Sequence, residues 1–109
     1  MKYLLLVLIL ALPAMAGPVF VATAYHTHGL TRDGHVARKG YCAVDPHVIP
    51  LGSRVHVKGI GWLVATDTGH NIKGKRIDVW LPTAKRCKVF GRHAVQVLKI
   101  KRPTKRRLV

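Results

Sequence analysis

Short β-forming runs, each ended by glycine or proline, constrain the fold of this chain most strongly. Apolar and polar residues alternate in 53–58, which is the period of a half-buried strand. Val19–Tyr25 is rich in β-forming residues, and 93–100 is predicted as the final strand. Further short runs of the same kind lie at Tyr41–Val44, 61–66 and 77–81, and a short helix is predicted at Ala84–Phe90. Six or seven short strands, one helix and no internal repeat predict an all-β fold, a compact β-barrel.

The first sixteen residues differ in kind from the rest of the chain. Lys2 precedes an apolar run over residues 4–12, and the small residues of 14–16 fit a cleavage site. This pattern predicts a signal peptide at 1–16 and an exported protein, because the run is too short to span a bilayer. A single domain is then expected over 17–100, followed by a basic disordered tail over 101–109.

The charge balance is strongly positive. The chain has 19 Lys and Arg against four Asp and no Glu, which gives a net charge of +15. Such a balance indicates an anionic partner. We expect the basic tail to contact anionic cell-wall polymers or a membrane surface, whereas export makes nucleic acid the least expected partner. A monomer without a cofactor is expected.

The two cysteines, Cys42 and Cys87, are an even pair in a chain predicted to be exported. Such pairs usually close in an oxidising compartment, so a Cys42–Cys87 disulfide is expected. The alternatives are two free thiols or a metal pair with histidine. The seven histidines have no ligand-like spacing beyond His26 and His28, so no metal site is predicted.

An acid–base enzyme needs a carboxyl group with a suitable pKa, and this chain has only four carboxyl side chains. Asp33 precedes Gly34 in a polar loop and is interpreted as a turn residue. Asp45, Asp67 and Asp78 lie at or near strand ends. Burial would raise their pKa values and the surrounding Lys and Arg would lower them. The alternative is that all three make only turns and ion pairs.

Residues 65–80 contain two of these acids and read as strand, loop and strand. Lys73 and two glycines lie in the loop, and Trp80 follows Asp78 on the same face of the predicted strand. Trp80 is therefore a candidate for stacking on a sugar ring, although most aromatic residues in so small a domain should be core.

Several short motifs occur together in a recognisable order. They are Ala22-Thr-Ala-Tyr25, Ala43-Val-Asp45-Pro46, Ile49-Pro-Leu-Gly52, Ala65-Thr-Asp67-Thr-Gly69, Ile72-Lys-Gly74 and Arg76-Ile-Asp78-Val79. Between about Val19 and Ile100 the chain resembles the three-aspartate (3D) domain family, which is akin to the barrel of the MltA-like lytic transglycosylases. The resemblance implies a six-stranded double-psi β-barrel and a peptidoglycan glycan strand as ligand.

The resemblance also implies a reaction and a set of residues. By motif, Asp78 would be the single acid/base that cleaves the MurNAc–GlcNAc β-1,4 bond without water, with Asp67 and Asp45 supporting it. Substrate contacts are expected from Tyr25, Thr68, Gly69, Lys73 and Trp80. The alternative function is a non-catalytic, cationic module that binds cell-wall glycan.

Overall fold

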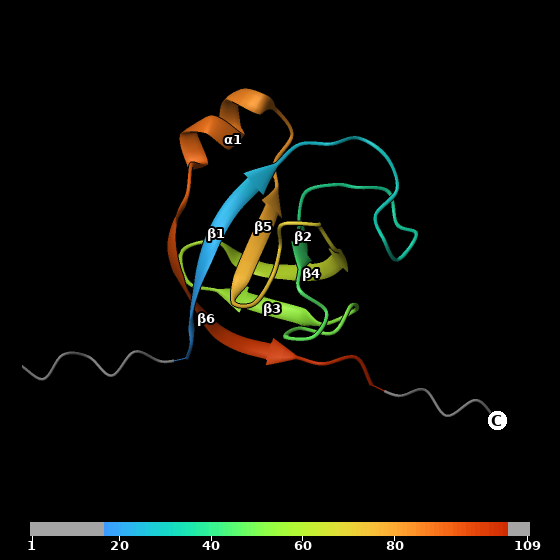
Figure 1. The fold of residues 1–109 in the computed structure, drawn as a ribbon, viewed down its shortest axis with the longest axis vertical. Coiled ribbons are helices and arrows are strands. Elements are labelled where there is room, and N and C mark those ends of the chain that lie inside the picture. The colour runs from blue at the N-terminus through green and yellow to red at the C-terminus, as the bar shows by residue number, and fades with distance from the viewer. Residues whose placement is uncertain (1–16, 105–109) are drawn as a thin grey trace, which may run out of the picture.

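The strands form a closed barrel (Figure 1). One set of apolar side chains along these strands lies inside it. The structure is a computed structural model and describes residues 17–104. Its elements are β1 (Val19–Tyr25), β2 (Tyr41–Val44), β3 (Arg54–Val57), β4 (Gly61–Asp67), β5 (Arg76–Trp80), α1 (Ala84–Phe90) and β6 (His93–Lys101). The expected all-β barrel of six strands with one short helix is confirmed.

The strands follow the order β1-β5-β2-β4-β3-β6 around the barrel, and β6 pairs with β1 to close it. The pairs β1·β5 and β2·β4 are parallel, whereas the other four pairs are antiparallel. This mixed ring is consistent with the double-psi barrel that the resemblance implies. Closure removes free strand edges, which would otherwise pair with other chains.

The core fills the interior of the ring. Phe20, Val55, Ile77 and Val97 come from four different strands and are each at most 2% exposed. Ile49, from the turn after β2, is also fully buried. Burial of such side chains is the dominant stabilising contribution in a domain of this size.

The helix α1 has a cap at each end and packs on the outside of β1. The Thr83 hydroxyl accepts a hydrogen bond from the Arg86 N–H at 3.2 Å, and Gly91 ends the helix with φ at 64°. Across residues 17–104, no helix is both long and apolar enough to cross a membrane.

The strand bounds differ from the predicted ones by only a few residues. Lys101, predicted to begin the tail, is the last residue of β6. The predicted signal peptide (1–16) and the last five residues of the predicted tail (105–109) lie outside the described residues. Residues 65–80 do form strand, loop and strand, but β4 and β5 are not paired, because β2 lies between them.

The predicted Cys42–Cys87 disulfide is not present in the structure, where both cysteines are free thiols. Cys42 is part of the barrel core, and its thiol donates to the Val64 carbonyl at 3.6 Å. Cys87 lies on α1, outside the barrel. Burial, and secondarily the nearby Asp78, raises the pKa of the Cys42 thiol to about 12, so this thiol is protonated and unreactive at neutral pH.

Candidate functional site

Four neighbouring strands bring two of the predicted acids into one line. Thr23 of β1 is opposite Asp78 of β5, Asp78 is opposite Ala43 of β2, and Ala43 is opposite Asp67 of β4. Residues directly opposite one another lie on the same face of a sheet. We call Thr23, Asp78, Ala43 and Asp67 the aspartate row.

An extra residue on β4 brings Asp67 into this row. Cys42 is opposite Ala65, whereas Ala43 is opposite Asp67, so the register shifts by one at Thr66. Such a bulge changes the direction in which the next side chain points. Thr66 itself is fully buried, and its hydroxyl has no hydrogen-bond partner within the described chain.

Asp78 is the acid with a raised pKa. Burial raises the pKa of its carboxyl above the usual 3.8; the Thr23 hydrogen bond and Arg76 lower it without offsetting the burial, and Asp67 raises it further. The Thr23 hydroxyl donates to Asp78 Oδ1 at 2.9 Å. A carboxyl held in this way can be protonated at a higher pH than an exposed one, as a general acid requires.

The loop of residues 26–40 lies over the Asp67 end of the row. The Arg32 N–H donates to Asp67 Oδ1 at 3.0 Å, and the Thr68 N–H donates to the same oxygen at 2.9 Å. The Asp33 N–H donates to the Thr66 carbonyl at 3.1 Å. This loop therefore positions Asp67 through its backbone rather than through a charged side chain.

Tyr25 is two residues beyond Thr23 on β1 and lies on the same side of that strand. Burial, followed by the charges of Asp67, Cys42 and Asp78, raises the pKa of its phenol well above the usual range. The buried hydroxyl has no hydrogen-bond partner of ordinary geometry among residues 17–104. It is therefore a neutral hydroxyl close to both acids, with the Asp67 carboxylate as the nearest acceptor for its hydrogen.

Asp45 lies apart from the aspartate row, directly after β2. Its Oδ2 accepts the Gly74 N–H at 2.8 Å, and its Oδ1 accepts the His47 N–H at 3.0 Å. These bonds lower the pKa of Asp45 to about 2. Gly74 has φ at 68°, a conformation that favours glycine. Asp45 thus ties the end of β2 to the loop before β5.

Three of the predicted substrate-binding residues share one basic hollow. Thr68, Gly69 and Lys73 line a space of about 360 Å³. The other lining residues are Arg32, Pro46, His47, Leu51 and His70. With two Lys or Arg side chains and two histidines in its wall, this hollow suits a negatively charged group.

Trp80, the candidate for stacking on a sugar ring, lies mostly inside the fold. It is only 8% exposed, and its indole N–H donates to the Thr27 carbonyl at 2.9 Å. The His28 ring packs edge-on against it at 6.3 Å. Trp80 also lines a hollow of about 340 Å³ together with Trp62, which is 40% exposed. Trp62, not Trp80, is therefore the open aromatic surface.

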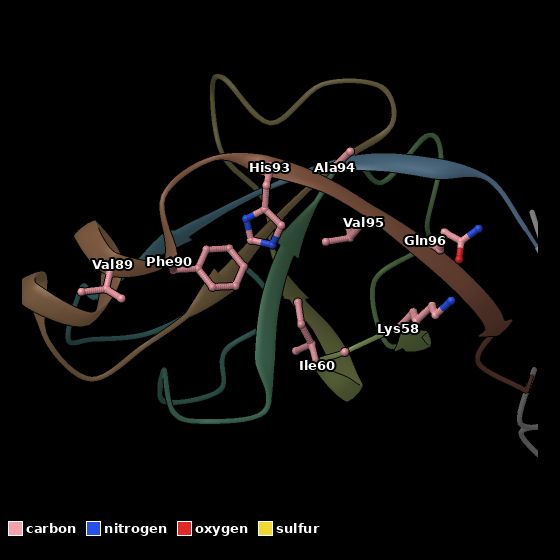
Figure 2. Close-up of a pocket in the computed structure, with 9 residues that line it drawn as sticks. Lys58, Ile60, Val89, Phe90, His93, Ala94, Val95 and Gln96 are labelled. Atoms are coloured by element: carbon pink, nitrogen blue, oxygen red, sulfur yellow. The ribbon is translucent and has the colours of Figure 1, made fainter.

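A larger hollow of about 540 Å³ lies where α1, β6 and the turn between β3 and β4 meet (Figure 2). Phe90 and His93 form one wall, with ring centroids 4.7 Å apart, and Ile60 and Lys58 lie opposite. None of the predicted site residues lines it. In the part of the chain that the structure describes, no cluster of three His, Cys, Asp or Glu could hold a metal ion.

Several site residues were not identified from the sequence. Thr23 and Ala43 enter the row only through strand register, and Arg32 and Thr27 act through backbone groups of a loop without periodicity. No residue type marks these roles in the sequence. Trp62 carried a usable signal, since an aromatic residue at an outward position of an alternating strand is exposed.

Comparisons with known proteins agree with this geometry. Residues 41–101, more than half of the chain, match the 3D domain family. The chain is 51% identical over 55 residues to "Putative cell wall shaping protein YabE" and, over the same length, 51% identical to "Cell wall-binding protein YocH", both of Bacillus subtilis. In each case the match covers 50% of this chain.

A third relative of the same organism, "SPbeta prophage-derived uncharacterized protein YorM", is 40% identical over an alignment of 93 residues, and this match covers 71% of the chain. The chain spans 14%, 19% and 39% of the lengths of YabE, YocH and YorM. The match to the family includes β2 to β6 and all three acids singled out above. The chain therefore belongs to the 3D domain family.

Proposed function

We propose that this protein acts on the bacterial cell wall, where it binds peptidoglycan glycan strands and cleaves the MurNAc–GlcNAc β-1,4 bond as a lytic transglycosylase. The observation that carries the proposal is Asp78. It is half-buried, has a raised pKa, and lies two strands from a second acid. The names of YabE and YocH, which refer to the cell wall, support the location.

The proposed reaction uses Asp78 twice. Its protonated carboxyl gives a proton to the leaving glycosidic oxygen as the bond to C1 breaks. The carboxylate then takes the proton of the C6 hydroxyl while that oxygen attacks C1, which closes a 1,6-anhydro ring. One acid suffices because the nucleophile belongs to the substrate, unlike the paired carboxylates of ordinary glycosidases.

Other groups would assist this reaction from their positions around the row. The Asp67 carboxylate would stabilise positive charge at C1, and the Tyr25 hydroxyl would donate to a sugar oxygen. The basic hollow, with Thr68, Gly69 and Lys73, would receive the carboxylates of the peptide stems. Asp45 would hold the loop that carries Lys73. The predicted signal peptide, as part of the same proposal, would export the protein.

The second candidate is a module that binds glycan without cleaving it. The loop of residues 26–40 favours it, because the Arg32 N–H occupies one oxygen of Asp67 and the Thr27 carbonyl occupies the Trp80 indole. The printed name of YocH describes binding alone.

Digestion of purified murein sacculi by the protein, with products separated by mass, tests the proposal. Anhydro-muropeptides are expected, and Asp78→Asn should abolish them. Asp33→Asn is the matched control, because the hydrogen bonds of the Asp33 carboxylate lie within its own turn, to Thr31 and His35. Reducing-end products would indicate a hydrolase instead. Sedimentation with sacculi without products would favour the binding module.

A further inference from the structure

The outer face of β3, β4 and β6 carries three Lys or Arg side chains and one histidine around one tryptophan. Lys101 is opposite Arg54, and Lys99 is opposite His56, which in turn is opposite Trp62. Paired residues share a face, so these side chains all point outward. We call Arg54, His56, Trp62, Lys99 and Lys101 the basic face.

Trp62 lies at the centre of this face and is 40% exposed. The His56 ring stacks on its ring, with centroids 4.8 Å apart and planes at 13°. Arg54 Cζ lies 5.2 Å and Lys101 Nζ 5.4 Å from the ring centroid. These cation–π contacts orient the cations, yet a large apolar ring remains open to solvent.

No acid offsets the charge of this face. The chain has four acidic side chains, and the three at residues 33, 45 and 78 lie on other segments; Asp67 ends β4 in the aspartate row. The two carboxylate ion pairs within residues 17–104 use His35 and His47. Arg54 and Lys101 are therefore like charges directly opposite each other, an arrangement that destabilises a strand pair.

We propose that the basic face binds a linear, phosphodiester-linked polymer of the cell wall, as a site separate from the aspartate row. The cell-wall location rests on the proposed function. The guanidinium of Arg54 matches phosphate geometry. Successive outward residues on a strand are roughly 7 Å apart, so Lys99 and Lys101 on β6 offer repeated cations to repeated phosphates. Trp62 packs against the carbon chain or sugar between them.

The strand order keeps the two sites apart. The aspartate row runs over β1, β5, β2 and the end of β4, whereas β3 and β6 complete the other side of the closed ring. A glycan at Asp78 and an anionic polymer at the basic face can therefore be bound at the same time. The basic face would hold the protein in the wall while the row acts on glycan.

Binding of the purified protein to poly(glycerol phosphate) at 0.15 M salt tests this proposal. The triple variant Arg54→Gln, Lys99→Gln, Lys101→Gln removes three charges from the face. The matched control Lys85→Gln, Arg86→Gln, Lys88→Gln removes three exposed charges from α1. We expect at least a tenfold loss of affinity for the first triple and less than a threefold loss for the second. Trp62→Ala, tested separately, should lose about threefold or more.

Equal losses in the two triples would show attraction by net charge alone and would overturn the proposal. A single-stranded oligonucleotide that binds more tightly than poly(glycerol phosphate), and loses affinity with the same face triple, would overturn the assigned polymer class. When the protein is in excess, the triple variant of the basic face should form the same products from sacculi as the unmodified protein. If the proposed function is wrong, by contrast, the unmodified protein will form no products from sacculi. The affinities of the unmodified protein and the variants for poly(glycerol phosphate) will then still be as expected.

Discussion

Asp45 and Asp78 are carboxylates with opposite surroundings. Asp45 is 8% exposed and accepts N–H groups with both oxygens, which lowers its pKa to about 2. Asp78 is half-buried, with Thr23 as its hydrogen-bond donor, and its pKa is raised. Burial raises the pKa of Asp78, whereas the N–H donors to Asp45 outweigh the effect of burial on its carboxyl. The first environment suits a structural tie, and the second suits proton transfer.

The largest expected difference is in product formation from sacculi. Asp78→Asn should lower it by roughly 10²-fold to 10⁴-fold, the range for loss of a general acid–base group. Asp45→Asn should lower it less than tenfold, because Asp45 supports a loop and does not reach the reacting atoms. An equal loss in both variants would show that the two acids do not differ in role.

Stability should respond to the same two substitutions with opposite signs. The pKa of Asp45 is lowered in the folded protein. Its contribution to folding stability is therefore present above pH 3.8 and is lost as the pH falls through about 2. Asp45→Asn should therefore lower Tm at pH 7 by roughly 5 °C. Thermal unfolding of both proteins near pH 2 should remove most of this difference.

The pKa of Asp78 is raised in the folded protein. Its contribution to folding stability is therefore fully present below pH 3.8 and is lost as the pH rises through the pKa of Asp78 in the folded protein. Asp78→Asn should accordingly keep or raise Tm at pH 7. The same series of unfolding curves measures this change, and a clear fall in Tm would assign Asp78 a structural role like that of Asp45.

A smaller effect is expected from the donor to Asp78. Thr23→Val removes the hydrogen bond that lowers the pKa of this carboxyl. The pKa of Asp78 should then rise further, and activity should persist to higher pH, with a change of about threefold at the optimum, the worth of one modest hydrogen bond. Thr23→Ser keeps the hydroxyl and should leave the pH–rate profile in place. A profile unmoved in both variants would remove Thr23 from the site.

The smallest expected effect concerns Thr66, whose buried hydroxyl lacks a partner. Thr66→Val replaces this polar group by an apolar one of similar shape, which should stabilise the protein by about 1 kcal/mol. Denaturant unfolding measures the change, and product formation should be unaltered. Destabilisation would mean that the hydroxyl is partnered in solution.

Much of the fold was predictable from local patterns. β-forming residues and the turn residues that follow them predicted the bounds of β1 and β2, and the threonine and glycine that flank Ala84–Phe90 predicted those of α1. These features depend only on neighbours in sequence. The placement of β2 between β4 and β5 was not predictable, because pairing depends on long-range contacts that no local period encodes.

The candidate site was predictable in its acids and not in their surroundings. The motifs pointed to Asp45, Asp67 and Asp78, but their different environments depend on Gly74, Thr23 and the register shift at Thr66. The low exposure of Trp80 depends on a loop that returns over it. The disulfide prediction was wrong for the same reason. Cys42 lies in the barrel core and Cys87 lies on α1, and no local pattern encodes this separation.

The bulge at Thr66 has a consequence for how such a site can change over time. The separation of Asp67 from Asp78 is fixed by two steps of main-chain pairing, roughly 10 Å between backbones, and not by side-chain packing. Substitutions elsewhere in the barrel leave this separation intact. A slip of the β2–β4 pairing by one residue, with Thr66 taking the place opposite Ala43, would instead turn Asp67 to the other face of the sheet in one event. The spacing of the two acids is thus tolerant of point substitution and sensitive to the register of β4.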